Sequence, residues 1–359
     1  MANIFSGLKD SLVNFGMEHL GRPFRDLRGW WWHVKKNVRN NTRWMLDTSC
    51  VWMGSRVSDG LAGEIDRRLY HDGSDHPGKH GVICMCDGEI HHGGLTDRLR
   101  GILTAYREAR RAGKEFYIYW NSPFELTDFL EPAGFDWRIS KEEVSRARED
   151  TSVIAVDDMS PLQSLLRLRA ALPKNVPQIH LYTNADSARG EYRELYSQLF
   201  KPAEAVENEV ARHKAVLGEG YWAVSQRFTT LLGDFNDCTE HILSQDEQAE
   251  LMHSMRDSFL ELCRQIPDDV RILITSDSVR YLDYIRDADP RIYIVEGEIR
   301  HIDIDNQGQE SAWMKTFVDQ QLLMGADTVV LMRTGRMYPS GFPRFAAEVG
   351  GARFVDRKF

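Results

Sequence analysis

The stretch HHGGLTDRLRG, residues 91–101, places two glycines and a carboxylate where a ligand could be held. Gly93 and Gly94 carry no Cβ, so the backbone can approach a ligand closely. The N-terminus of the helix that follows would favour an anion. No lysine stands where the phosphate-binding loop of a nucleotide triphosphatase needs one. We therefore expect this loop, with Asp97, to face a ligand, although a glycine pair also serves plain backbone geometry at such a turn.

Arg227 follows the apolar stretch GYWAVSQ and must leave the core where the predicted strand ends. Its planar fork of donors suits a diphosphate. The structural alternative is an ion pair with Asp234 or Asp237, a few residues further along the chain. The sequence leaves both interpretations open.

A third group of polar side chains follows the apolar strand ILITS. Ser276, Asp277 and Ser278 come where this strand ends. In an open α/β sheet the ligand binds beyond the carboxyl ends of the strands. These side chains are therefore placed to hydrogen-bond a base or a ribose.

The last predicted helix begins at Ser340, Gly341 and Phe342. The first N–H groups of a helix have no partner within the helix and can bind a phosphate. The alternative is that Ser340 only caps the helix.

Alternating strands and helices must position these groups. A strand at 82–86, a helix after the glycine loop and a strand at 115–120 form a βαβ unit, and further strands are predicted at 151–158 and 176–184. Beyond a break near Lys201 and Pro202, the expected elements are a helix at 203–217, a strand at 220–228, a helix at 244–266, a strand at 270–278, a helix at 279–287, a strand at 291–297, a helix at 311–326, a strand at 327–332 and a helix at 341–351. This order predicts an α/β fold of two doubly wound halves with a cleft at their strand ends.

A chain of 359 residues suggests two domains. We place the first domain at 76–200 on the acceptor side and the second at 201–359 on the nucleotide side, with 1–75 as an aromatic and basic extension of the first. A net charge of -9 argues against a general nucleic-acid binder. The sequence has no run apolar enough to span a bilayer, so we expect a cytoplasmic protein.

Two further patterns concern the cysteines and the N-terminus. The five cysteines lack paired metal spacing, and Cys84 and Cys86 lie in an apolar run, so reduced core thiols are expected. Apolar residues at helical spacing in residues 4–15 allow peripheral contact with a membrane or a partner, although packing on the protein itself is the alternative.

Taken in order, the motifs resemble those of GDP-fucose-dependent fucosyltransferases, which include the bacterial nodulation, α-1,2, α-1,6 and protein O-fucosylating types. GGLTDRLRGILTAYREARRAGK resembles their GG-x-x-(N/D)-x-L loop and helix, and VSQRFTTLLGDF is similar to their H-x-R-x-G-D region. ILITSDS is similar to their strand ending in T-D, and TVVLMRTGRMYPSGFPRFAAEVGG resembles the closing S-x-F-s-x-x-A motif. The match covers residues 80–355 in the expected order.

This resemblance implies a GT-B fold, with two Rossmann-like domains facing a cleft, and an inverting transfer of L-fucose from GDP-fucose without a metal. Arg227 would hold the diphosphate, Asp277 would contact guanine or ribose, and Asp97 would face the fucose. The donor-binding residues expected from the motifs and the resemblance together are Gly93, Gly94, Arg227, Asp234, Ser276, Asp277, Ser278, Ser340, Gly341 and Phe342.

The sequence departs from the family pattern after the predicted strand. Ser225 stands where the family has histidine, and FTTLLGD is longer than the usual x-G-D, which leaves the role of Asp234 open. Inversion also needs a base that takes the proton of the acceptor hydroxyl. Asp97, Asp234 and His92 are candidates, and we favour Asp97.

Other functions remain open at this stage. The motif Asp303-Ile304-Asp305 matches the D-x-D signature of metal-dependent GT-A transferases, although its late position favours a solvated acidic loop. The fold could also serve another nucleotide sugar, or a sugar-nucleotide-binding module without turnover. The predicted partners are therefore a nucleotide-sugar donor and a glycan acceptor of open identity.

Overall fold

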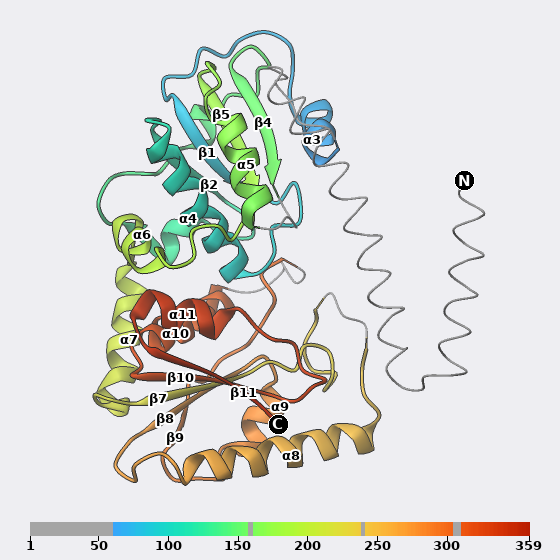
Figure 1. Cartoon of the computed structure of the whole chain (residues 1–359), viewed down its shortest axis with the longest axis vertical. Helices are drawn as coiled ribbons and strands as arrows, with labels where there is room; N and C mark the ends of the chain where they lie inside the picture. Colours follow the sequence, from blue (N-terminus) through green and yellow to red (C-terminus); the bar gives the residue numbers. More distant parts are fainter. Residues whose placement is uncertain (1–59, 157–160, 238–240, 304–309) are drawn as a thin grey trace, which may run out of the picture.

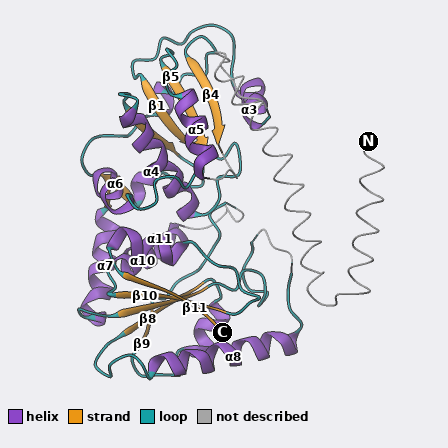
Figure 2. Ribbon diagram, in the orientation of Figure 1, coloured by secondary structure: helices purple, strands orange, loops and turns teal. Residues whose placement is uncertain are grey.

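The computed structural model describes residues 60–156, 161–237, 241–303 and 310–359 (Figure 1). Two parallel sheets lie one above the other along the long axis, each accompanied by helices (Figures 1 and 2). Their inner strands are short, mostly apolar runs with nearly every residue buried, whereas the edge strands β9 (Ile292–Ile294) and β11 (Arg353–Lys358) are partly exposed. Such runs are typical of parallel sheets, in which both faces are covered.

The first sheet has the strand order β2-β1-β5-β4, and all its neighbours are parallel. Its strands are β1 (Gly81–Cys86), β2 (Phe116–Trp120), β4 (Thr151–Val156) and β5 (Gln178–Thr183). Val82, Cys84 and Cys86 pack on one face with α4 (Leu95–Arg111) and α5 (Pro161–Ala171), while Ile83 and Met85 pack on the other with α3 (Leu61–Leu69). The glycine loop lies between β1 and α4.

The second sheet has the order β11-β10-β7-β8-β9, again parallel throughout. Its strands are β7 (Trp222–Gln226), β8 (Ile272–Ser276), β9 (Ile292–Ile294), β10 (Thr328–Arg333) and β11 (Arg353–Lys358). One face carries α7 (Glu204–Leu217), α10 (Glu310–Met324) and α11 (Phe342–Gly350), and the other carries α8 (Gln245–Cys263) and α9 (Val279–Ile285).

The two halves share one apolar core. It runs from the α4 face of the first sheet to α10 and α11 of the second. The rings of Phe129 and Phe317 stack with centroids 4.5 Å apart, and those of Tyr192 and Phe345 lie 5.0 Å apart. The connecting elements are α6 (Tyr192–Leu199), the antiparallel pair β3 (Leu130–Pro132) and β6 (Phe200–Pro202), and two short 3-10 turns at Leu126–Asp128 and Lys141–Glu143.

The prediction of an α/β fold with two parallel sheets is confirmed, as is the order of the strands and helices named from the sequence. Sequence patterns did not reveal α3, β3, β6 or the edge strand β11. The predicted break near Lys201 falls inside β6. The apolar pattern at residues 4–15 and most of the predicted extension lie outside the described residues, and the domain limits stay a prediction.

Three cysteines in the described part of the chain, Cys84, Cys86 and Cys263, are free and buried, as expected of core thiols. In the same residues, no helix combines the length and apolarity needed to cross a bilayer.

We predict that Gly101→Ala destabilises the fold, because a Cβ at this position would lie 2.1 Å from the carbonyl oxygen of Thr183. Relieving that overlap should lower the free energy of unfolding by about 1–3 kcal/mol, measured by urea denaturation. Gly78→Ala is the matched control, since nothing lies within 4 Å of its added Cβ. Equal stability of the two variants would contradict the close packing of α4 on β5.

Candidate functional site

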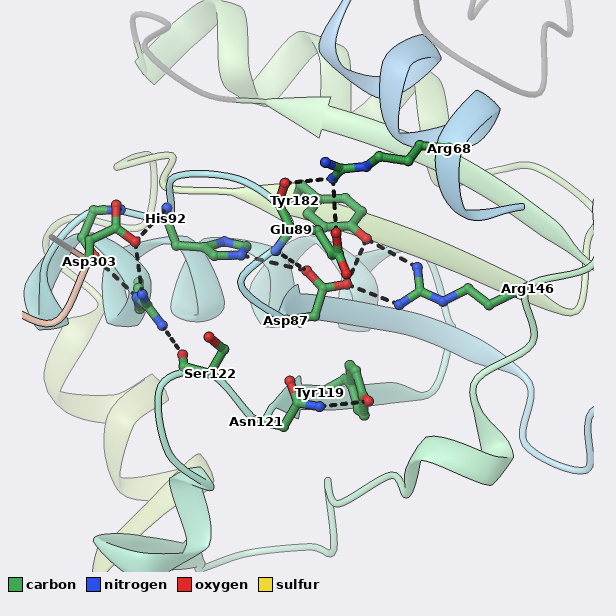
Figure 3. A network of polar contacts seen from close by, with 12 residues as sticks. Arg68, Asp87, Glu89, His92, Tyr119, Asn121, Ser122, Arg146, Tyr182 and Asp303 are labelled. Carbon is green, nitrogen blue, oxygen red and sulfur yellow. Dashed lines mark hydrogen bonds and ion pairs between the residues drawn. The ribbon is translucent and has the colours of Figure 1, made fainter. Parts of the chain in front are cut away.

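The loops that follow β1 and β9 meet through the carboxylate of Asp303. One oxygen, Oδ2, accepts from His91 Nδ1 at 2.7 Å and from the backbone N–H of Gly93 at 3.0 Å. The other accepts from the backbone N–H of His92 at 3.2 Å (Figure 3). It also accepts from Arg98 Nη2 at 3.0 Å. The Arg98 side chain is only 2% exposed. Although burial acts to raise it, these donors and the arginine charge lower the pKa of Asp303 overall.

The two glycines differ in what the backbone requires of them. Gly93 has φ +77°, and a Cβ there would lie 2.9 Å from the Asp97 side chain. A Cβ on Gly94 would lie 3.8 Å from His301 Nε2 and 4.0 Å from Asp97 Oδ2, which is ordinary contact. One side chain from each half of the chain therefore lies close to Gly94.

Asp97 does not stand alone at this loop. Its Oδ1 forms a close ion pair with Arg100, one turn along α4, and Arg100 Nη1 also lies 3.5 Å from Asp186. A Cβ on Gly341 would lie 3.3 Å from Arg100 Nη1, so the first turns of α4 and α11 are neighbours. Arg100, Arg189, Arg344, Ser340, Gly341 and Tyr192 are among the residues that line a cavity of about 200 Å³ at this point.

Arg227 emerges directly after β7, as predicted, and its side chain is 23% exposed. Its Nη2 pairs with Asp237 at 2.5 Å, its Nε lies 3.8 Å from Asp277, and its guanidinium lies 5.4 Å from the ring centre of Phe235. The ion-pair alternative is therefore observed with Asp237. It does not exclude a diphosphate, because a doubly charged ligand would compete with a single carboxylate.

Asp234 and Ser278 are engaged with α9. The Asp234 carboxylate accepts from Ser278 Oγ at 2.8 Å and from the backbone N–H of Arg280 at 3.0 Å. Ser278 Oγ accepts from the backbone N–H of Tyr281 as the N-cap. In this structure both residues hold the first turn of α9, and their predicted contact with a donor stays a prediction.

Asp277 is buried and shapes the loop that carries Arg227. Its two carboxylate oxygens accept the backbone N–H groups of Phe228 and Thr229, each at 2.8 Å. Burial raises its pKa to about 6, against the lowering effect of Arg227 and the two N–H groups. Ser276 is also buried and accepts from the backbone N–H of Ser278. Whether these residues also contact a base or ribose stays a prediction.

The start of α11 is capped by Gly341 rather than by Ser340, and phosphate binding there stays a prediction. The helix begins at Phe342 with Gly341 as its N-cap, and Ser340 Oγ accepts from the backbone N–H of Phe342 at 3.3 Å. Pro343 in the first turn has no N–H to offer. The serine therefore supports the helix start, while the positive end of the helix borders the cavity between the two halves.

One polar network was not predicted. Asp87, the residue directly after β1, accepts from Tyr182 Oη at 2.9 Å and from Arg146 Nη2 at 3.0 Å (Figure 3). His92 Nε2 lies 3.7 Å from Asp87, and the His92 side chain is 2% exposed. Although burial opposes it, His92 and Arg146 lower the pKa of Asp87. An aspartate directly after an apolar strand was the available signal, the same one that pointed to Asp277.

The three candidate bases differ in position. His92 is enclosed beside Asp87, and Asp234 is bound at α9. Of the three, Asp97 is the one with a carboxylate oxygen close to Gly94.

The expectation of a solvated acidic loop is wrong for Asp303, whose side chain is 9% exposed and bound to Arg98. Asp305, the second residue of that motif, lies outside the described residues. Across the described ranges, no group of three or more His, Cys, Asp or Glu side chains is arranged to hold a metal ion.

No protein-family model matches this sequence, and no curated protein matches it. The structure is similar to the NodZ alpha-1,6-fucosyltransferase co-crystallised with GDP, at 14% identity over 75% of this chain and 92% of that chain, with a TM-score of 0.48. It is similar to a variant of Arabidopsis thaliana FUT1 in complex with GDP, at 13% identity over 82% of this chain and 73% of that chain, with a TM-score of 0.48. It is also similar to POFUT1 in complex with GDP, at 12% identity over 77% of this chain and 99% of that chain, with a TM-score of 0.47. The first of these is named as a fucosyltransferase, and all three were crystallised with GDP.

We predict that Asp303→Ala lowers the free energy of unfolding by about 3–5 kcal/mol, because it leaves the buried Arg98 without its carboxylate. Urea denaturation measures this loss. Glu298→Ala in the same loop is the control: its partner Arg300 is partly exposed, so the change should stay below about 1 kcal/mol. Similar small losses in both variants would contradict a large contribution of the Asp303–Arg98 ion pair to the free energy of unfolding.

A second prediction concerns pH. Because the pKa of Asp277 is raised from 3.8 to about 6 on folding, its contribution to stability is fully present below 3.8 and is lost as the pH rises through about 6. The stability of the wild type relative to Asp277→Asn should therefore fall by about 2 kcal/mol between about pH 4.5 and about pH 7.5. Unfolding curves of both proteins across this range measure the difference, and a pH-independent difference would refute the raised pKa.

Proposed function

We propose that this protein is an inverting glycosyltransferase that transfers L-fucose from GDP-fucose to a glycan hydroxyl. One observation supports the proposal: Arg100, on the helix after the glycine loop, lies beside Gly341 at the start of α11, so motifs from both halves line one cavity. His301, in the loop after β9, lies beside Gly94 and close enough to Arg227 for its pKa to respond to that charge. A nucleotide sugar needs this combination of cation, helix N-terminus and open loop.

Arg227 is proposed to bind the diphosphate and to stabilise the charge that develops on the leaving GDP. A fixed guanidinium aimed at a developing charge stabilises a transition state more than a solvent-exposed one does. Asp277 holds the loop after Arg227 by binding two of its N–H groups. Asp237 neutralises the guanidinium until a diphosphate replaces it.

Asp97 is proposed as the general base. Inversion requires a base on the face of the sugar opposite the diphosphate, and such assistance contributes about 10²–10⁴-fold to the rate. Oδ1 pairs with Arg100, and Oδ2 lies close to Gly94. The acceptor hydroxyl would donate to Oδ2.

Arginines and the positive end of α11 would carry the diphosphate charge, so we propose that transfer needs no metal ion. We also propose that residues 76–200 serve the acceptor and residues 201–359 the nucleotide. The glycan acceptor, a cytoplasmic location and a peripheral membrane contact through the N-terminus belong to the same proposal.

A nucleotide screen tests the function directly. We expect GDP to raise the melting temperature of the protein more than UDP, ADP or CDP do, with or without EDTA, because a ligand stabilises the folded state that binds it. A preference for UDP that depends on a metal would defeat the proposal. Release of fucose from GDP-fucose without an acceptor would separate an enzyme from a binding module.

Arg227→Ala is the matched variant for this screen. It should lose the GDP-dependent shift and reduce transfer by about 10²-fold or more, since it removes the charge that faces the diphosphate. Arg212→Ala is its control, because Arg212 is an exposed residue on α7 paired with Glu209. Full transfer by Arg227→Ala at subsaturating donor would overturn the assignment.

A further inference from the structure

His301 occupies the junction between the two halves of the chain. It follows β9 in the second half, yet its Nε2 lies 3.8 Å from the position of a Cβ on Gly94 in the first half. Its ring lies 6.3 Å from the ring of Phe235, the same ring on which Arg227 rests. The imidazole thus stands between the proposed diphosphate arginine and the proposed sugar loop.

The hydrogen bonds of His301 fix which nitrogen carries the proton. The backbone N–H of Asp303 donates to Nδ1 at 3.2 Å, so Nδ1 is an acceptor. Burial first, and then the charge of Arg227, lower the pKa of His301, although Asp237, Asp303 and Asp97 oppose this. A neutral ring with an accepting Nδ1 must carry its proton on Nε2. The ring can therefore donate a hydrogen bond towards Gly94 but cannot accept a proton there.

Asp97 is the second polar side chain close to Gly94. Its Oδ2 lies 4.0 Å from the same Cβ position on Gly94. An N–H donor and a carboxylate acceptor thus both lie close to Gly94. A sugar hydroxyl suits such a pair, because it can both accept and donate a hydrogen bond.

We propose that His301 binds the sugar of the nucleotide-sugar donor, donating from Nε2 to a sugar hydroxyl close to Gly94 and Asp97. This inference rests on the proposed function and adds a residue of the second half to the sugar site. Because His301 belongs to the loop that Asp303 anchors, the sugar site is complete only when the two halves meet.

Calorimetric titration with GDP and with GDP-fucose, in the absence of acceptor, tests this assignment. A contact to the sugar alone predicts that His301→Ala weakens GDP-fucose binding about 5- to 10-fold and leaves GDP binding within about 2-fold of the wild type. His301→Gln should restore most of the difference, because its side-chain amide can donate from a similar position.

The control is His253→Ala, since His253 lies on α8 and contacts Tyr284. An equal loss for GDP and GDP-fucose, or no loss for either, would overturn the role of His301. If the wild type prefers another nucleotide and its sugar, the fucose assignment fails while the same comparison still decides His301. If it binds no nucleotide and no nucleotide sugar, both proposals fall.

Discussion

The buried pairing of Asp303 with Arg98 is the interaction on which the site depends. A carboxylate loses its hydration on burial and needs several donors in exchange. Here the guanidinium and two backbone N–H groups of the glycine loop supply them, all from the other half of the chain. The contact fixes the glycine loop and the β9 loop against each other. It thereby sets the position of His301, two residues before Asp303, above Gly94.

Asp277 is a second buried carboxylate of the candidate site, and its burial disfavours the charged form. Asp277 is buried with its pKa raised to about 6, so at neutral pH its charge is maintained against desolvation. What it gains is the conformation of the loop after β7, where Thr229 has a φ of +55°. Holding a strained loop with a buried charge is expected where a side chain such as Arg227 must be aimed, rather than where the fold alone is served.

Local sequence patterns were enough to predict the fold and the positions of several residues of the candidate site. Continuous apolar runs predict parallel strands, and residues directly after them, such as Arg227 and Asp277, must lie at one edge of a sheet. Ion pairs between residues far apart in the sequence could not be predicted from such local patterns. Arg98 and Asp303 are 205 residues apart, and the sequence around Asp303 resembles a metal motif. The edge strand β11 was missed because the charged residues of Arg353–Lys358 interrupt the apolar pattern by which strands are predicted.

Arginines of the candidate site are paired with carboxylates of the same chain. Asp237 pairs with Arg227, and Asp97 pairs with Arg100. A chain of net charge -9 can therefore still gather cations locally. The proposed diphosphate would compete with the buried carboxylate of Asp237 for the guanidinium of Arg227. Binding would then exchange one anion for another at a cation that the fold already holds in place.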